Sequence, residues 1–304
     1  MFWRTLAPGW LGGVPRVRDR SALLDYVALT RPRVLLLVLL TTPPALALGS
    51  GWPDPITVAG VLLGTSLLGA GCGALNAWYE RERAAYMIRT RDRPLPAGRL
   101  SPTRALAFGL AVSAAGLLAL LAAGGPLPAL IGALALAHYI VVYTAWLKPR
   151  TPWAVVVGGI SGAIAPLIAD AASDGRIGIW GVALFAIVFV WQPPHFWAIA
   201  LYRSREYAAA GFPTLPTVSG DRATRRQMLG WALALIPVTL LPWLAGALGS
   251  LYAGVALVGG AAFVASILHA MRRANDTGDR RVFVVSIAYL AILFTAILME
   301  TLPT

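Results

Sequence analysis

The sequence has 304 residues, of which 58% are hydrophobic and only 12% are charged, and its mean hydropathy is +0.71. Soluble domains usually carry about a quarter charged residues, so this composition excludes a soluble globular protein. The net charge of +12 would be typical of a nucleic-acid-binding protein if the chain were soluble.

Nine apolar segments each approach the ~20 residues that a membrane-spanning helix needs. They cover roughly residues 33–50, 56–79, 104–123, 127–146, 153–171, 178–200, 228–247, 249–270 and 282–300. Lipid offers the backbone no hydrogen-bond partner, so each segment must be helical. We therefore predict an all-α polytopic membrane bundle of nine transmembrane helices. It would form a single domain over residues 1–304, with a cytoplasmic arm at residues 1–24.

The basic residues fall on one side of this nine-span arrangement. Of the 25 Lys and Arg residues, 24 lie on the side of the N-terminus and only Arg176 lies on the other. The positive-inside rule then places the N-terminus in the cytoplasm and the C-terminus outside. The strong preference for Arg over Lys is typical of a GC-rich bacterial genome, which points to a bacterial inner membrane. Topology thus explains the charge of +12, and we expect no nucleic-acid partner.

The main functional candidates lie where the second span runs into a long loop. Asn76 and Glu80 are four residues apart and share one helix face. From Glu80 to Arg104 the sequence has seven arginines and three acidic residues, a net charge of +4. This pattern suits an anionic ligand bound together with a divalent metal. The alternative is a solvated loop whose charge only sets the topology.

A second long connection follows the sixth span. Both connections contain Leu-Pro followed by Gly and Arg, at 95–99 and at 215–222. This recurrence predicts two similar four-helix halves that face each other across a cavity. A chance match is the alternative.

Ionisable side chains inside a bilayer point to function. The sixth span contains Trp-Gln-Pro-Pro-His-Phe-Trp at 191–197, and we expect its two prolines to break the helix and open its cytoplasmic half. His195 is a candidate ligand, acid or base, or substrate anchor, with an interhelical hydrogen bond as the alternative. Glu206 would share its face if the helix continued. His138, in the fourth span, is better explained as a hydrogen-bonded core histidine.

Mg²⁺ prefers hard oxygen ligands and usually takes one or two carboxylates together with substrate phosphates. Guanidinium and ammonium groups suit a diphosphate. The metal-side candidates are Asn76, Glu80 and Glu206, and the diphosphate-side candidates are Arg89, Arg93 and Lys148.

These motifs resemble the protoheme IX farnesyltransferases, or heme O synthases, a family in the UbiA superfamily of membrane prenyltransferases. The resemblance rests on Asn76 and Glu80, Met-Ile-Arg-Thr-Arg-Asp-Arg-Pro-Leu-Pro-Ala-Gly at 87–98, Leu-Thr-Arg-Pro-Arg at 29–33, Tyr-Thr at 143–144, Leu-Lys at 147–148 and Glu-Tyr at 206–207. The run Trp-Gln-x-Pro-His-Phe at 191–196 distinguishes this family from relatives with an aspartate-rich second motif.

The resemblance implies a UbiA-type fold that binds farnesyl diphosphate through Mg²⁺. The farnesyl group would be transferred to a vinyl group of heme B, giving heme O for terminal oxidases. The implied catalytic residues are Asn76, Glu80, His195 and Glu206, of which Asn76, Glu80 and Glu206 would be metal ligands and His195 would lie on the heme side. The implied diphosphate contacts are Arg89, Arg93, Lys148 and Arg203. The implied prenyl and heme pocket contains Tyr143, Trp191, Gln192, Phe196, Tyr202 and Tyr207. The expected partners are the two substrates, the lipid bilayer, and heme A synthase or oxidase-assembly proteins.

One position departs from the family pattern. The first motif has carboxylates four and eight residues after its asparagine, but the eighth residue here is Ala84. Ala84 cannot bind a metal, Glu82 should lie on the opposite helix face, and Asp92 could reach back instead. Three alternatives therefore stay open: a UbiA-type prenyltransferase with an aromatic or quinone-precursor acceptor, a catalytically weakened heme-binding or assembly homologue, and a transporter.

Overall fold

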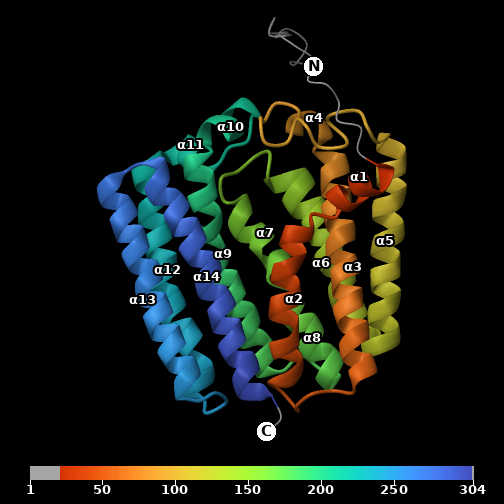
Figure 1. Cartoon of the computed structure of the whole chain (residues 1–304), viewed down its shortest axis with the longest axis vertical. Helices are drawn as coiled ribbons and strands as arrows, with labels where there is room; N and C mark the ends of the chain where they lie inside the picture. Colours follow the sequence, from red (N-terminus) through yellow and green to blue (C-terminus); the bar gives the residue numbers. More distant parts are fainter. Residues whose placement is uncertain (1–20, 303–304) are drawn as a thin grey trace, which may run out of the picture.

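The computed structural model describes residues 21–302, and every element in this part of the chain is a helix (Figure 1). Most of the predicted N-terminal arm lies outside the described residues. In chain order the elements are α1 (Ala22–Leu29), α2 (Pro32–Ala47), α3 (Pro55–Tyr79), α4 (Arg81–Ala84), α5 (Pro102–Gly124), α6 (Pro126–Ala137), the π-helical η1 (His138–Leu147), α7 (Ala154–Gly162), α8 (Ala165–Asp174), α9 (Ile179–Tyr202), α10 (Ser204–Ala209), α11 (Leu215–Ser219), α12 (Asp221–Leu244), α13 (Ser250–Arg273) and α14 (Asp276–Thr301).

Eight stretches of the described chain are long and apolar enough to cross a membrane: α3, α5, α6 with η1, α7 with α8, α9, α12, α13 and α14. A ninth apolar segment, Leu35–Ala47 within α2, is shorter. Each predicted span corresponds to one of these nine segments, so the polytopic all-α bundle is confirmed. The seventh and ninth spans begin earlier than predicted, because α12 starts at Asp221 and α14 at Asp276.

Several helix starts follow from local sequence. Asp54 caps α3 by accepting hydrogen bonds from the backbone N–H groups of Ile56 and Thr57, and Ser101 caps α5 in the same way through Arg104. A proline follows each cap at the first helical position, where its missing N–H has no intrahelical partner to lose. The Asp54 cap marks the start of the second span, and the Ser101 cap marks the end of the first long connection and the start of the third span.

Both long connections lie at the same end of the bundle, with α4 in one and α10 and α11 in the other (Figure 1). We call this the basic end, because all described Lys and Arg residues except Arg176 belong to segments at this end. The C-terminal end of α14 and the α8–α9 turn with Arg176 lie at the opposite end (Figure 1). The predicted segregation of charge along the bundle is therefore present in the fold.

The prediction that Pro193 and Pro194 break the sixth span is wrong, since both lie inside the continuous helix α9. Neighbouring helices can hold a proline-containing membrane helix together, and α9 packs against α7, α8, α12 and α14. The interrupted span is instead the fifth, where α7 ends at Gly162 and α8 starts at Ala165. A Cβ atom at Gly162 would lie 2.3 Å from the Gln192 amide oxygen, so this glycine makes room for Gln192.

A buried ion pair joins α12 to α14 near the basic end. Arg225 donates from Nε and Nη2 to the two carboxylate oxygens of Asp279, over 2.9 and 2.6 Å. Both side chains are nearly inaccessible, and a bidentate pair of this kind is strong and geometrically specific. The sequence analysis counted Arg225 only as a topology charge, whereas it fixes the packing of the last span.

Among the described helices α3 and α5 pack against each other most extensively, and Gly71 permits a close approach between them. A Cβ atom at this position would lie 2.1 Å from Ser113 Oγ and 2.9 Å from Ser113 N. Small residues in membrane helices allow such close approach. The α3–α5 pair matters because α3 carries Asn76 and is followed directly by Glu80.

We predict that Gly71→Ala lowers the thermal unfolding midpoint in detergent, because the added methyl group meets the α5 backbone and overpacking costs about 1–3 kcal/mol. Gly254→Ala on α13 is the matched control, since no atom lies within 4 Å of the Cβ it would add. Unfolding followed by circular dichroism should show a lower midpoint for Gly71→Ala alone. Equal midpoints for the two variants would contradict the close packing.

Candidate active site

Asn76 lies fully buried in the last turn of α3 and links three parts of the chain. Its amide nitrogen donates to Thr144 Oγ1 of η1 over 3.0 Å. Its amide oxygen accepts from Arg31 Nη2 over 2.6 Å. A buried polar side chain needs such partners, and here they fix the α1–α2 junction, α3 and η1 relative to one another.

Glu80 follows directly after α3 and forms an ion pair with Lys148, which follows η1. Burial alone would raise the pKa of the Glu80 carboxyl, but the Lys148 and Arg31 charges outweigh it and hold the pKa below its ordinary value. Glu80 is therefore ionised at neutral pH. The predicted juxtaposition of Asn76, Glu80 and Lys148 is present in the structure.

Arg31 was missed as a site residue by the sequence analysis. It is the residue before α2 and adopts a left-handed backbone conformation, with φ 53°, which is rare outside glycine and is often found at functional sites. Its Nε is buried and has no hydrogen-bond partner within residues 21–302. The sequence held one signal, because a cation at a helix N-terminus opposes the helix dipole and needs another reason to be there.

Arg93 belongs to the same basic cluster. Burial, together with the nearby positive charges of Arg31 and Arg89, lowers the pKa of Arg93 to about 10. Cations placed together in this way favour a bound anion, which would relieve their mutual repulsion. We use the name inner cluster for Arg31, Asn76, Glu80, Arg93 and Lys148.

The second long connection reaches the inner cluster through Phe212. Lys148 Nζ lies 5.0 Å from the centroid of the Phe212 ring and 5.5 Å from that of Tyr143. Phe212 also packs with Met87 of the first connection in a buried group that includes Tyr207 at its edge. The two connections are thus in contact above Glu80, and Phe212 is a second residue that the sequence analysis did not name.

The acidic candidates have distinct environments. Glu206 lies on α10, after the chain leaves α9 at Arg203, so it does not share a continuous helix with His195. Arg203 Nη1 donates to Glu206 Oε1 over 2.6 Å, while Glu206 Oε2 is buried and finds no hydrogen-bond partner in the described part of the chain. Glu82 is exposed and pairs with Arg81. Asp92 is exposed as well, and its backbone oxygen accepts from Arg99.

The position of the absent motif carboxylate, Ala84, is buried. The Thr90 hydroxyl donates to the Ala84 backbone oxygen over 2.6 Å, which closes the loop against this residue. Arg89, a predicted diphosphate contact, is exposed. It lies close enough to Arg93 to influence that group's pKa.

The predicted prenyl and heme pocket residues divide into separate groups. Tyr143 lies against Gly158 of α7, and Gln192 donates to the Gly159 oxygen over 2.9 Å. Trp191 and Tyr202 face α14 instead, through Ser286 and Phe283 respectively. Phe196 is 37% exposed, and Tyr207 belongs to the Met87 and Phe212 group at the basic end. The sequence could not divide this set, because it depends on which neighbour each face of α9 meets.

Two further polar residues have structural explanations. The Asp170 carboxylate accepts from the N–H of Gly178, the residue before α9, over 2.5 Å and so ties α8 to the start of α9. His138 Nδ1 lies 2.5 Å from Ser161 Oγ of the interrupted span. The expectation that His138 is a hydrogen-bonded histidine is confirmed.

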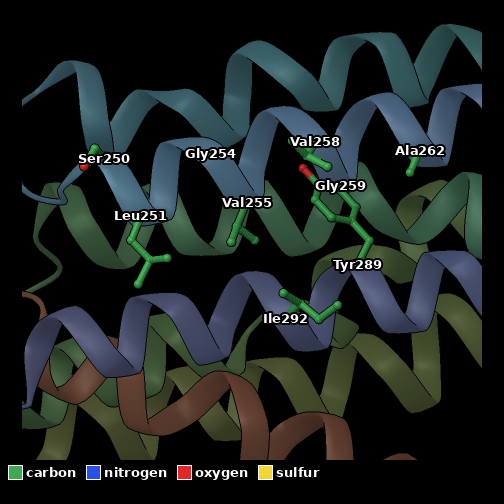
Figure 2. Close-up of a pocket in the computed structure, with 9 residues that line it drawn as sticks. All are labelled: Ser250, Leu251, Gly254, Val255, Val258, Gly259, Ala262, Tyr289 and Ile292. Atoms are coloured by element: carbon green, nitrogen blue, oxygen red, sulfur yellow. The ribbon is translucent and has the colours of Figure 1, made fainter.

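A groove of about 580 Å³ lies elsewhere, between α13 and α14 (Figure 2). Its lining is aliphatic or small apart from Ser250 and Tyr289. The Tyr289 hydroxyl donates to the Ala256 oxygen over 3.2 Å. The groove has no charged side chain in its lining, so it lacks the groups for acid, base or metal chemistry.

Residues 35–296 match the UbiA prenyltransferase family. The chain belongs to this family. It is 41% identical to a protoheme IX farnesyltransferase of Symbiobacterium thermophilum, over 94% of this chain and 96% of that protein. It is also 41% identical to a protoheme IX farnesyltransferase of Novosphingobium aromaticivorans, over 92% of this chain and 94% of the relative. The resemblance found in the motifs therefore extends over nearly the full length.

Solved structures share the UbiA fold at low sequence identity. A digeranylgeranylglyceryl phosphate synthase superposes with a TM-score of 0.76 at 16% identity, covering 92% of this chain and 98% of that one. The apo UbiA homologue of Aeropyrum pernix K1 gives 0.72 at 19% identity, covering 89% and 98%. The homologue of Archaeoglobus fulgidus bound to GPP and Mg²⁺ gives 0.62 at 18% identity, covering 90% and 99%.

We predict that Lys148→Met raises the pKa of Glu80, because burial is then opposed mainly by Arg31. In the parent, the Glu80 carboxylate should stay ionised as the pH falls and should take up a proton only below the ordinary pKa of Glu. In the variant it should take up a proton at a higher pH. Infrared difference spectra can follow the protonated carbonyl band, with Glu80→Gln identifying the signal.

Arg150→Met is the matched control for this measurement, because among the described residues the Arg150 side chain bonds only to the backbone oxygens of Ala145 and Trp146. It should leave the titration unchanged. If Lys148→Met titrates like the parent, Lys148 does not set the charge state of Glu80.

Proposed function

We propose that this chain transfers the farnesyl group of farnesyl diphosphate to a vinyl group of heme B, giving heme O. The main support is the inner cluster, which places several cations around one partly buried carboxylate in a chain about 40% identical to protoheme IX farnesyltransferases. Charge segregation supports a multi-span protein of a bacterial inner membrane with its basic end in the cytoplasm. The lipid bilayer, the two substrates and the proteins that use heme O would be its partners.

The inner cluster binds the diphosphate and stabilises it as a leaving group. Breaking the allylic C–O bond sends the electron pair to a diphosphate oxygen, and charge-assisted hydrogen bonds from Arg31, Arg93 and Lys148 stabilise the added charge. The unpartnered Nε of Arg31 is a donor that a diphosphate oxygen can satisfy. Arg89 would add a contact from the exposed side.

The farnesyl cation then needs a neutral, electron-rich surrounding. The Tyr143 and Phe212 rings already lie about equally near the Lys148 ammonium, at 5.5 and 5.0 Å, so aromatic faces at this site can stabilise a cation. The vinyl π electrons of heme B form the new C–C bond. A water molecule adds to the resulting cation and loses a proton, which completes the hydroxyethylfarnesyl group.

The residues fit a role for Mg²⁺. The candidate ligands include the carboxylates of Glu80 and Glu206. The buried Oε2 of Glu206 has no hydrogen-bond partner among the described residues. No group of three or more His, Cys, Asp or Glu in the described chain could hold a metal by itself, which agrees with the preference of Mg²⁺ for few carboxylates plus substrate phosphates. Glu80 and Glu206, with Asn76, would hold the ion, and when bound it supplies charge neutralisation of the diphosphate.

We predict that Glu80→Gln lowers kcat/KM for heme O formation by about 100-fold or more, as expected when a charged group acting in the transition state is lost. The assay uses purified protein in detergent with heme B, farnesyl diphosphate and Mg²⁺, read by mass spectrometry. Glu82→Gln is the control, because the Glu82 side chain is 82% exposed. Equal loss in both variants would argue against a specific role for Glu80.

We also predict that Ala84→Asp lowers the Mg²⁺ concentration for half-maximal activity, because it restores a carboxylate near Glu80, while Glu206→Gln raises it. Magnesium titrations of the same assay measure both effects. Activity in Ala84→Asp but none in the parent would favour the weakened heme-binding homologue over an active enzyme. A parent that prenylates an aromatic acceptor but not heme B would favour the other acceptor class.

A further inference from the structure

Helix α1 turns its only charged side chain toward the protein and an apolar surface outward. Asp25 and Leu29, four residues apart on one helix face, are buried, with 3% and 2% of their surface exposed. Leu23, Leu24 and Val27 are 71%, 55% and 45% exposed, and we call these three residues the α1 face. An exposed apolar surface of this kind marks a place that another molecule covers.

The buried carboxylate ties α1 to the first connection. Both oxygens of Asp25 accept from Arg99 Nε, over 3.1 and 3.0 Å. Arg99 Nη2 also donates to the backbone oxygen of Asp92 over 3.0 Å. The Asp25 and Arg99 side chains are largely buried, so solvent screens this pair less than an ion pair on the surface.

The apolar inner side of α1 contacts the same connection. Leu29 lies in one buried cluster with Leu95 and Leu100. Leu95 is two residues from Arg93, and Arg31 is two residues from Leu29. Helix α1 is therefore coupled to two of the three cations of the inner cluster.

The position of α1 indicates what covers its outer side. The helix lies at the basic end (Figure 1), and only Thr30 and Arg31 separate it from α2. Its Tyr26 ring packs on Phe108 of α5 with centroids 4.9 Å apart. Helix α5 is long and apolar enough to cross a membrane, and Leu110, two residues beyond Phe108, is exposed. The α1 face is therefore continuous with the lipid-facing surface where the spans reach the basic end.

Charge and size favour a lipid surface over a protein partner. Residues 1–20, which precede α1 in the sequence, contain four arginines and one aspartate. Basic residues beside an apolar interfacial helix are attracted to the anionic headgroups of the cytoplasmic leaflet. A stable protein interface needs about 800 Å² on each partner, and three side chains of one short helix offer far less.

We propose that the α1 face inserts into the anionic headgroup region of the cytoplasmic leaflet, and that this contact holds the first connection beside the inner cluster through Asp25 and Arg99. The insertion stands on the geometry of α1, whereas its effect on catalysis rests on the proposed function. Loss of the lipid contact frees α1, loosens residues 92–100 and weakens diphosphate binding more than turnover.

Nitroxide labels test the insertion. Cys72 is the only cysteine, so Leu23→Cys and Val27→Cys are labelled one at a time in a Cys72→Ala chain. Leu118→Cys on α5 is the lipid control and Arg91→Cys in the first connection is the water control, since both side chains are exposed. In phosphatidylglycerol vesicles, oxygen should relax the labels at 23 and 27 and a nickel chelate should not, as for the label at 118. Nickel access equal to that at 91 would overturn the insertion.

Two other occupants of the α1 face would give different signals. A second copy of the chain would shield the labels from both reagents and cause spin–spin broadening that disappears on dilution in lipid. Residues 1–20 of the same chain would shield the labels from both reagents until these residues are deleted. Either result would overturn the lipid proposal.

Asp25→Asn tests the coupling to the first connection. Loss of this charged hydrogen bond should speed trypsin cleavage within residues 80–101 at least about tenfold. It should also raise KM for farnesyl diphosphate with little change in kcat. Asp276→Asn is the matched control, because Asp276 is an exposed acid at the start of α14. Unchanged cleavage in a folded Asp25→Asn would overturn the coupling.

Leu23→Asp keeps the ion pair but opposes insertion, because a charge in lipid is costly. In phosphatidylglycerol vesicles it should speed the same cleavage, whereas Leu23→Met should not. Equal cleavage of these two variants would contradict a link between the lipid contact and the first connection.

The label and trypsin measurements do not require heme O formation. If the parent forms no heme O while the labels and the cleavage behave as expected, only the proposed function is overturned. If heme O forms while the labels at 23 and 27 are open to the nickel chelate, only the inference about α1 is overturned.

Discussion

The structure depends on the pairing of charged and polar groups that are buried where the helices reach the basic end. Arg31 bonds to Asn76 across 45 residues of sequence, and Lys148 pairs with Glu80 across 68. A charge left unpaired at this depth would be strongly destabilising. The pairs therefore fix the relative positions of the α1–α2 junction, α3 and η1, which are the elements that surround the proposed diphosphate site.

The second half of the chain joins this network mainly through packing. The Lys148 ammonium lies over the ring of Phe212. Phe212 also packs with Met87 in one buried cluster. The backbone turn that carries Phe212 follows α10, where Arg203 and Glu206 are already paired. Closure of the two connections on each other would exclude water from the inner cluster, and a reactive farnesyl cation requires that exclusion.

The fold class followed from composition, because long apolar segments have only one solution in lipid. The pairing of Asn76, Glu80 and Lys148 at one end followed from motif positions and span order. The proline prediction failed because a local rule met tertiary packing: α9 stays continuous, and the interruption occurs at Gly162 beside Gln192. Arg31 and Phe212 were missed since their roles depend on contacts with distant segments, which no local pattern encodes.

An alanine at position 84 is consistent with the charge balance of the inner cluster. The inner cluster has three cations, Arg31, Arg93 and Lys148, and a single carboxylate, Glu80. A second carboxylate would add an oxygen ligand for a metal, but it would also repel the diphosphate that these cations attract. Under the proposed function, a methyl group in its place would shift the stabilisation of the leaving group from the metal toward the guanidinium groups. The lowered pKa of Arg93 is due mainly to burial, and the nearby positive charges of Arg31 and Arg89 lower it further.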